Sequence, residues 1–367
     1  QSRTYFADKI NDFQDNLSHE YTIMFSIAVF LLVILLGVFI YFSNKLSARF
    51  VKPILQLSDN VREIAGGNLD KKITDINTGD EIEHLAVCFN AMTDELQNYM
   101  NNLKKVTADK ERIATELNVA KDIQHGMLPS VFPPYPDRKE FDIYATMDAA
   151  KEVGGDFYDF YLLDDDHLVV TIADVSGKGI PASLFMVISK TILKNFAVFL
   201  NDSKELLREE DFSEVMTRAN DQLCEGNEEM MFVAVFLGML DLKTGRFVYV
   251  NGGHNPPIIY HHAERYCEYL TVKKNFVLGG MEDMNFVQQE IYLLHGDMIF
   301  MYTDGVNEAM NEKKEEYTSE RLLKFMNKTN CDMDLTELLK AVKNDVSEHV
   351  GNAEQSDDMT MMALRRN

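Results

Sequence analysis

An uninterrupted apolar stretch lies near the start of the chain. Residues 22–42 contain no charged side chain over 21 positions. An α-helix needs about 20 apolar residues to cross a bilayer. A buried core helix of this length would carry a polar face, and a secretory signal would have a shorter apolar region followed by a cleavage site. The pattern therefore predicts a transmembrane helix over residues 21–43.

The charges on the two sides of this stretch differ in sign. Acidic residues precede it and basic residues follow it: Asp8, Asp12, Asp15 and Glu20, then Lys45, Arg49 and Lys52. By the positive-inside rule, residues 1–20 lie outside and everything after about residue 43 is cytoplasmic, with a single span in the inner (plasma) membrane. Twenty external residues are too few for a sensor, and the chain starts at Gln1. We therefore expect residues 1–20 to be the end of a truncated extracytoplasmic sensor.

Two helical patterns follow the membrane stretch. The first has apolar residues at helical spacing from Ile54 to Ile64 and stops at Gly66-Gly67. The second begins at Asp80-Glu81 and repeats every seven residues. Its two seam positions are Ile82, Phe89, Leu96, Leu103, Lys110, Leu117 and Gln124, and Leu85, Met92, Tyr99, Val106, Ile113, Ala120 and Met127.

Such a heptad repeat predicts a parallel coiled coil over residues 82–127, about 70 Å long, and hence a homodimer. A single amphipathic helix packed on its own domain would drift off a strict 3.5-residue period. Lys110 and Gln124 interrupt the apolar seam, and they either set its register or weaken it.

Residues 45–98 resemble a HAMP domain. The matching features are Pro53 after the membrane stretch, the connector start Gly67-Asn68-Leu69, and Gly79-Asp80-Glu81-Ile82 with Leu85. The resemblance implies a parallel four-helix dimer that passes signals from a membrane span to a cytoplasmic output. We accordingly assign residues 44–98 to a HAMP domain and residues 99–128 to a coiled-coil signalling linker.

The hydrophobic period changes from 3.5 to 2 after the prolines at 129–136. Strands are predicted at 142–147, 157–163, 168–173, 231–240, 246–251, 257–261, 286–293, 298–303 and 359–365. Helices are predicted at 180–200, 212–225, 319–328 and 334–349. Strands in runs with grouped helices indicate an α+β domain over residues 129–367, with two packed sheets covered by helices.

Charge and cysteine content narrow the class of function. The 367 residues carry a net charge of −23, and residues 129–367 hold 42 Asp and Glu against 23 Lys and Arg. A surface this acidic repels nucleic acid. The four cysteines, Cys88, Cys224, Cys267 and Cys331, form no CxxC pair, so we expect reduced thiols rather than a zinc site or disulfides.

Two aspartates stand at equal distances from the turn of one predicted hairpin. Position 165, the centre of the turn Asp164-Asp165-Asp166, is also the midpoint between Asp156 and Asp174. In an antiparallel hairpin, residues equidistant from the turn face each other across the ladder. The pattern therefore places two carboxylates side by side at the open end of the hairpin.

Further aspartates occupy the ends of two later strands. Asp304 follows the strand 298–303, and Asp357 and Asp358 precede the strand 359–365. If these strands are antiparallel neighbours, the acids meet at one sheet edge. Four hard oxygen ligands without nearby histidine or cysteine suit Mg²⁺ or Mn²⁺. Two such ions can clamp a phosphoryl group for in-line attack. Taken singly, each aspartate has an ordinary alternative as a turn or cap residue.

Five ordered motifs carry a second resemblance. They are Glu152-Val153-Gly154-Gly155-Asp156-Phe157-Tyr158-Asp159, Asp174-Val175-Ser176-Gly177-Lys178-Gly179, Asn251-Gly252-Gly253-His254-Asn255-Pro256-Pro257, Thr303-Asp304-Gly305-Val306 and Asp357-Asp358-Met359-Thr360. The series resembles the sporulation-protein-E and sigma-regulator branch of the metal-dependent, type 2C-like serine phosphatases.

This resemblance implies a four-layer α-β-β-α sandwich with two Mn²⁺ or Mg²⁺ ions at one edge. Asp174 would bridge both ions, and Asp156, Asp304 and Asp357 would complete the ligand set. The carbonyl of Val175 would be a further ligand, and Asp358 stands where relatives often place a residue that supports the ligands. The implied substrate is a phosphorylated regulator protein of the anti-anti-sigma type.

The chain departs from the eukaryotic members at two places. Lys151 is the nearest cation where those members have a phosphate-gripping arginine, and Ser176 stands near the position of their histidine. Lys178 is our hypothesis for a phosphate contact. His254 lies in a Gly-Gly-His-Asn-Pro-Pro loop that suggests catalysis, but we favour a structural loop histidine.

The sequence thus predicts a membrane-anchored, dimeric phosphatase that hydrolyses phosphoserine or phosphothreonine in response to a signal. One alternative is a catalytically silent binding scaffold of the same fold, although all four aspartates are present. A second is a HAMP-linked histidine kinase with His125 on the coil. His125 is followed by Gly126-Met127-Leu128-Pro129 rather than a phosphoacceptor context, and the sequence shows no glycine-rich ATP site.

Overall fold

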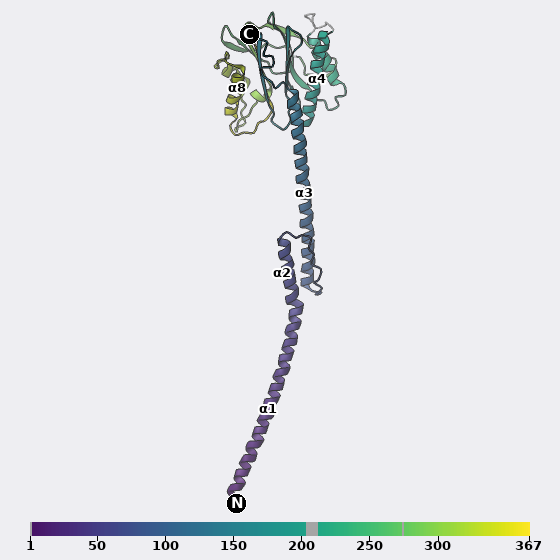
Figure 1. Ribbon diagram of the computed structural model, residues 1–367, viewed down its shortest axis with the longest axis vertical. Helices are drawn as coiled ribbons and strands as arrows, with labels where there is room; N and C mark the ends of the chain where they lie inside the picture. Colours follow the sequence, from purple (N-terminus) through teal and green to yellow (C-terminus); the bar gives the residue numbers. More distant parts are fainter. Residues whose placement is uncertain (1, 203–211, 274) are drawn as a thin grey trace. The chain divides into compact units, whose positions relative to one another are not determined.

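One long helix contains the apolar stretch. The computed structural model describes residues 2–202, 212–273 and 275–367. The chain divides into two compact units, Gln1–Arg112 and Ile113–Asn367. In the first unit, α1 (Ser2–Leu46) passes through a π-helical turn (Ser47–Val51) into α2 (Lys52–Ala65) (Figure 1). The apolar side chains of α1 are exposed, including Leu35 at 70%. By length and composition α1 is able to span a bilayer.

A small apolar core joins α2 to the start of α3 (Glu81–Met127) within this first unit. Ile73 and Ile76 of the connector are buried with Ala86 of α3. The side chain of Asn90 donates to the carbonyl of Ile73 and accepts from its amide, both at 2.9 Å. Gly67 ends α2 with a φ of +100°, a conformation that glycine adopts without strain. The unit thus contains the elements expected of a HAMP domain: a helix, a connector held by hydrogen bonds and apolar contacts, and a second helix.

Helix α3 covers the whole predicted coiled-coil range as one element of 47 residues. Its seam side chains are exposed along most of that length, for example Leu103 at 48% and Val106 at 66%. An exposed apolar stripe of this length favours pairing with another helix. The pairing itself stays a prediction.

The second unit contains two five-stranded antiparallel sheets. One sheet has the order β1-β10-β9-β6-β7, with bounds Phe141–Asp148, Met359–Arg366, Met298–Tyr302, Ile258–His261 and Tyr266–Tyr269. The other has the order β2-β3-β4-β5-β8, with bounds Phe157–Leu162, His167–Val175, Val233–Asp241, Arg246–Gly252 and Gln289–Tyr292.

Helices cover the outer face of each sheet. Helices α4 (Ile180–Asp202) and α5 (Ser213–Cys224) pack on the β2-containing sheet, and α7 (Ser319–Met326) and α8 (Leu335–Val350) pack on the β1-containing sheet. Figure 1 shows α4 and α8 on opposite sides of the strands. The predicted four-layer α-β-β-α sandwich is confirmed.

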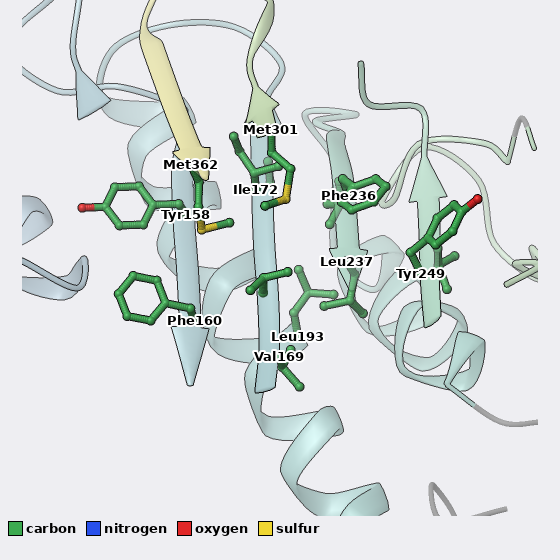
Figure 2. Packing of buried hydrophobic residues seen from close by; sticks show 14 of the residues in the cluster. Tyr158, Phe160, Val169, Ile172, Leu193, Phe236, Leu237, Tyr249, Met301 and Met362 are labelled. Atoms are coloured by element: carbon green, nitrogen blue, oxygen red, sulfur yellow. The ribbon is translucent and has the colours of Figure 1, made fainter. Parts of the chain in front are cut away.

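The main core lies between the two sheets and continues under α4. Met301 and Met362 of one sheet belong to the same buried cluster as Ile172 of the other (Figure 2). Leu193 of α4 extends this cluster to the outer face of the β2-containing sheet. A second cluster joins Phe300 to α8 on the far side of the β1-containing sheet. Strands buried on both faces explain the nearly continuous apolar runs in the sequence.

All nine predicted strands and all four predicted helices of this unit are present. Two short elements were not predicted, strand β7 and the single-turn helix α6 (Asp304–Asn307). Each has only four residues, which is too short for a hydrophobic period to register. Glu264 and Arg265 directly precede strand β7 and Glu268 lies within it, so no apolar run marks the strand in the sequence.

Candidate active site

The register of the β2–β3 hairpin brings the first two aspartates together. Phe157 pairs with Ala173, so the next pair outward is Asp156 and Asp174. Asp174 also pairs with Ala234 of β4, which places it inside the sheet rather than at a free end. Asp156 is only 2% exposed. The predicted juxtaposition of these two carboxylates is confirmed.

The other sheet supplies two threonines that hold Asp156. Strands β9 and β10 are antiparallel neighbours, and the amide of Thr303 donates to the carbonyl of Thr360 at 3.0 Å. The hydroxyls of Thr303 and Thr360 both donate to Oδ2 of Asp156, each at 2.7 Å. Asp156 therefore connects the two sheets at this edge. Neither threonine was predicted from the sequence as a site residue, although each lies inside one of the five motifs.

The two consecutive acids before β10 have different surroundings. Asp358 is 8% exposed, and its carboxylate accepts from the amides of Ala150 and Gly155, each at 2.8 Å. A Cβ on Gly154 would lie 2.2 Å from Oδ2 of Asp358, so only glycine fits at that position. Asp358 therefore holds the loop that leads into Asp156.

Asp357 is the more accessible of the pair, with a side chain that is 39% exposed. The amine of Lys178 lies 2.7 Å from its Oδ2 and also donates to the carbonyl of Ser356 at 2.7 Å. Lys178 therefore lies at the acidic edge, and its contact with phosphate stays a hypothesis. Both of its contacts are with the chain itself.

Burial and mutual repulsion raise the pKa values of three carboxyl groups, those of Asp156, Asp174 and Asp304. Burial raises the pKa of Asp156, with a further rise from the charge of Asp174, while the two threonine hydroxyls act in the opposite direction. Burial, followed by the charge of Asp304, raises the pKa of Asp174 to about 7. Burial and then Asp357 raise the pKa of Asp304. Such a cluster of acids carries a negative charge that a cation would compensate.

The donor atoms at this edge are carboxylate and carbonyl oxygens, which fit Mg²⁺ or Mn²⁺ by their chemistry. A Cβ on Gly155 would lie 2.9 Å from the carbonyl oxygen of Val175, so the glycine leaves that oxygen uncrowded. As the side chains stand, no three His, Cys, Asp or Glu residues of the described chain form a group that would hold an ion. One carboxylate, Asp357, is neutralised by Lys178.

His254 is enclosed in its own loop. It is 7% exposed, its amide donates to Oδ1 of Asn251 at 2.8 Å, and its Nδ1 donates to the carbonyl of Asn255 at 3.1 Å. Burial lowers the pKa of His254 to about 4. Within the described residues its Nε2 has no hydrogen-bond partner. These contacts favour the structural interpretation over a catalytic one.

A buried ion pair lies one layer behind the site. Lys190 of α4 binds Asp159 of β2 at 2.7 Å, with side chains that are 10% and 5% exposed. Asp159 therefore ties α4, the helix that follows the Asp174 loop, to the strand that follows Asp156.

Two antiparallel sheets between helices, with acids gathered at one edge, define the type 2C-like phosphatase fold. The SiaA-PP2C domain of Pseudomonas aeruginosa shares this fold, with a TM-score of 0.59 at 18% identity over 71% of this chain and 99% of that one. The chain belongs to the family of stage II sporulation protein E (SpoIIE), whose profile matches residues 164–367. The profile of the HAMP domain matches residues 45–98. Both resemblances found in the sequence are thereby confirmed.

Two curated relatives extend the match toward the N-terminus. The chain is 28% identical to protein IcfG of Synechocystis sp. over 365 residues, covering 93% of this chain and 55% of IcfG. It is 28% identical to phosphoserine phosphatase RsbU of Bacillus subtilis over 259 residues, covering 70% of this chain and 72% of RsbU. The chain thus spans about half the length of IcfG.

Proposed function

We propose that residues 129–367 hydrolyse phosphoserine or phosphothreonine on a protein, with two divalent ions, Mn²⁺ or Mg²⁺, as cofactors. The observation that carries the proposal is the pairing of Asp156 and Asp174 at a buried edge where Asp304 and Asp357 add further charge. Membership of the SpoIIE family and the relation to a phosphoserine phosphatase support it.

Each residue of the site has a proposed role. The two ions would be held by Asp156, Asp174, Asp304, Asp357 and the carbonyl of Val175. When bound, a pair of divalent ions polarises the phosphoryl group and activates the attacking water.

The residues around this ligand set orient it. The hydroxyls of Thr303 and Thr360 fix the carboxylate of Asp156 by two hydrogen bonds. Asp358 holds the glycine loop in place through two amides. With Asp357 serving as an ion ligand, the amine of Lys178 would be available to contact the phosphate. This arrangement would place an amine at the acidic edge of a chain whose nearest cation before Asp156 is Lys151 rather than an arginine.

The rest of the chain anchors and regulates this activity. We propose a single span at residues 21–43, a HAMP domain at 44–98 and a coiled-coil linker at 99–128, with residues 1–20 outside the membrane and the catalytic unit in the cytoplasm. Exposed heptad positions on α3 support a parallel homodimer. The proposed substrate is a phosphorylated regulator of the anti-anti-sigma type, so the output is control of a sigma factor.

The test is Mn²⁺-dependent turnover of p-nitrophenyl phosphate and of a phosphoserine protein by the 367-residue chain in detergent micelles. Asp174→Asn should lower kcat by on the order of 10²-fold or more, because the variant loses a charge at the reacting centre. The matched control is Asp165→Asn at the exposed tip of the same hairpin, where turnover should stay unchanged. Absence of metal-dependent turnover, or equal rates in Asp174→Asn and wild type, would favour the binding scaffold. Autophosphorylation at His125 would favour the kinase alternative.

A further inference from the structure

Gln124, in the last turn of α3, contacts the backbone of the loop that leads into the active site. Its Nε2 donates to the carbonyl of Gly154 at 2.6 Å, and its Oε1 accepts from the amide of Gly154 at 3.1 Å. Gln124 is 4% exposed, whereas its neighbour Ile123 is 62% exposed and His125 is also exposed. One amide side chain thus satisfies both polar groups of a single buried residue.

Gly154 is held from two sides. Gln124 binds its two backbone groups, and the next amide, that of Gly155, donates to Asp358 at 2.8 Å. Gly155 also packs against the carbonyl of Val175, and Asp156 follows directly. A displacement of the Gly154 peptide would therefore move Asp156 and Val175 relative to each other without any change in the ligand residues themselves.

The end of α3 is fixed to the catalytic unit next to this contact. Leu128 is buried in the main core, and the hydroxyl of Tyr158 donates to the carbonyl of Pro129 at 2.7 Å. Successive residues on an α-helix point about 100° apart. A rotation of α3 that carries Gln124 away would leave a buried N–H and a buried C=O without partners, which is costly.

We propose that Gln124 is a positioning residue: through its two hydrogen bonds to Gly154, the linker helix sets the place of Asp156 relative to Asp174 and Val175. The inference rests on the proposed two-ion site, and it adds the device by which α3 controls that site. Loss of the glutamine amide lowers the affinity for the ions. It leaves the recognition of the phosphate ester intact once the ions are bound.

The experiment compares three variants of the full 367-residue chain in detergent micelles. Gln124→Met keeps the length of the side chain and removes both hydrogen bonds. Gln124→Glu keeps the acceptor for the Gly154 amide and loses the donor to its carbonyl. His125→Met is the matched control at the adjacent, exposed position.

Three readouts separate positioning from a general loss of structure. Calorimetric titration with Mn²⁺ alone should show about 10-fold weaker binding in Gln124→Met, at least as large a loss in Gln124→Glu, whose second oxygen faces the carbonyl of Gly154, and no change in His125→Met. Hydrogen exchange of the Gly154 amide should be faster in Gln124→Met and remain protected in Gln124→Glu. At saturating Mn²⁺, the KM for p-nitrophenyl phosphate should equal that of wild type in all three variants.

Wild-type Mn²⁺ affinity and wild-type exchange at Gly154 in Gln124→Met would overturn the proposal, whatever the turnover. If Gln124→Met fails to fold, unaltered Mn²⁺ affinity in a folded Gln124→Glu would overturn it as well. The proposed function is judged separately. If wild type binds Mn²⁺ but does not turn over substrate, the phosphatase activity is wrong while the binding and exchange measurements still test Gln124.

Discussion

The buried histidine of the Asn251–Pro257 loop should make the catalytic unit sensitive to acid. His254 titrates near pH 6.5 in an unfolded chain, whereas burial lowers its pKa in the folded protein to about 4. Between pH 4 and pH 6.5, His254 therefore binds a proton in the unfolded chain but stays neutral in the folded protein. Stability contributed by neutral His254 is therefore fully present above pH 6.5 and is lost as the pH falls toward 4.

The size of this effect follows from the two pKa values. Their separation, at about 1.4 kcal/mol per pH unit, gives a ceiling of roughly 3 kcal/mol, of which on the order of 2 kcal/mol is lost at pH 5. The hydrogen bond from Nδ1 to the carbonyl of Asn255 opposes the shift, and burial is the larger effect. A loss of this size is a substantial fraction of the stability of a typical domain.

The assay is urea unfolding of residues 113–367 at pH 7.5 and pH 5, for wild type and His254→Gln. The variant has no titrating side chain at this position, so the pH-dependent loss should be smaller than in wild type by on the order of 2 kcal/mol. Buried acids such as Asp156, whose pKa is raised, act in the opposite direction. They are common to both proteins and cancel in the comparison.

Equal pH-dependent losses in wild type and His254→Gln would refute the reasoning. The histidine would then accept a proton in the folded state, which means that water or a polar partner reaches Nε2. That outcome would revive the catalytic interpretation of His254, which its enclosed loop now disfavours.

Three further substitutions test the site and the linker. Lys178→Ala should raise the KM of a phosphoserine protein about 10-fold with a smaller effect on kcat, and unchanged kinetics would remove Lys178 from the site. Gly305→Ala would place a Cβ 1.9 Å from the carbonyl oxygen of Asp358, so thermal unfolding should show a loss of about 1–3 kcal/mol. The control Gly126→Ala has open space on α3 and should be neutral or stabilising by up to about 1 kcal/mol. Leu103→Pro should cost the helix about 3 kcal/mol and abolish the dimer in sedimentation experiments, whereas unchanged mass and activity would exclude coupling through α3.

The strand pairing could be predicted because local rules determine it. A short turn sets the register of its hairpin, so equal distances from position 165 were enough to place Asp156 opposite Asp174. The apolar runs that become β9 and β10 likewise showed where Asp304 and Asp357 would lie. The short strand β7 could not be predicted, since four residues beside charged neighbours carry no resolvable period.

The contacts between the sheets could not be predicted in the same way. Thr303 and Thr360 bind Asp156 because the two sheets stack with a particular offset, and no pattern along one strand reports that offset. The adjacent Asp357 and Asp358 differ in exposure and in hydrogen-bond partners, and this difference also depends on packing. Asp358 is directed toward the amides of a loop about 200 residues earlier in the chain, which only the folded arrangement reveals.

Gln124 shows most clearly where a sequence pattern stops being informative. The heptad repeat placed it at a seam position and left two interpretations, a register-setting residue or a weak point. A heptad identifies the face of a helix but not the partner of that face. In the structure the seam becomes progressively covered toward its end, from exposed Ile113 through half-buried Leu117 to buried Gln124, and the covering surface is this chain's own catalytic unit. Because an α-helix is stiff over the roughly three turns between Ile113 and Gln124, a change of register where the seam is exposed must also turn Gln124 against Gly154.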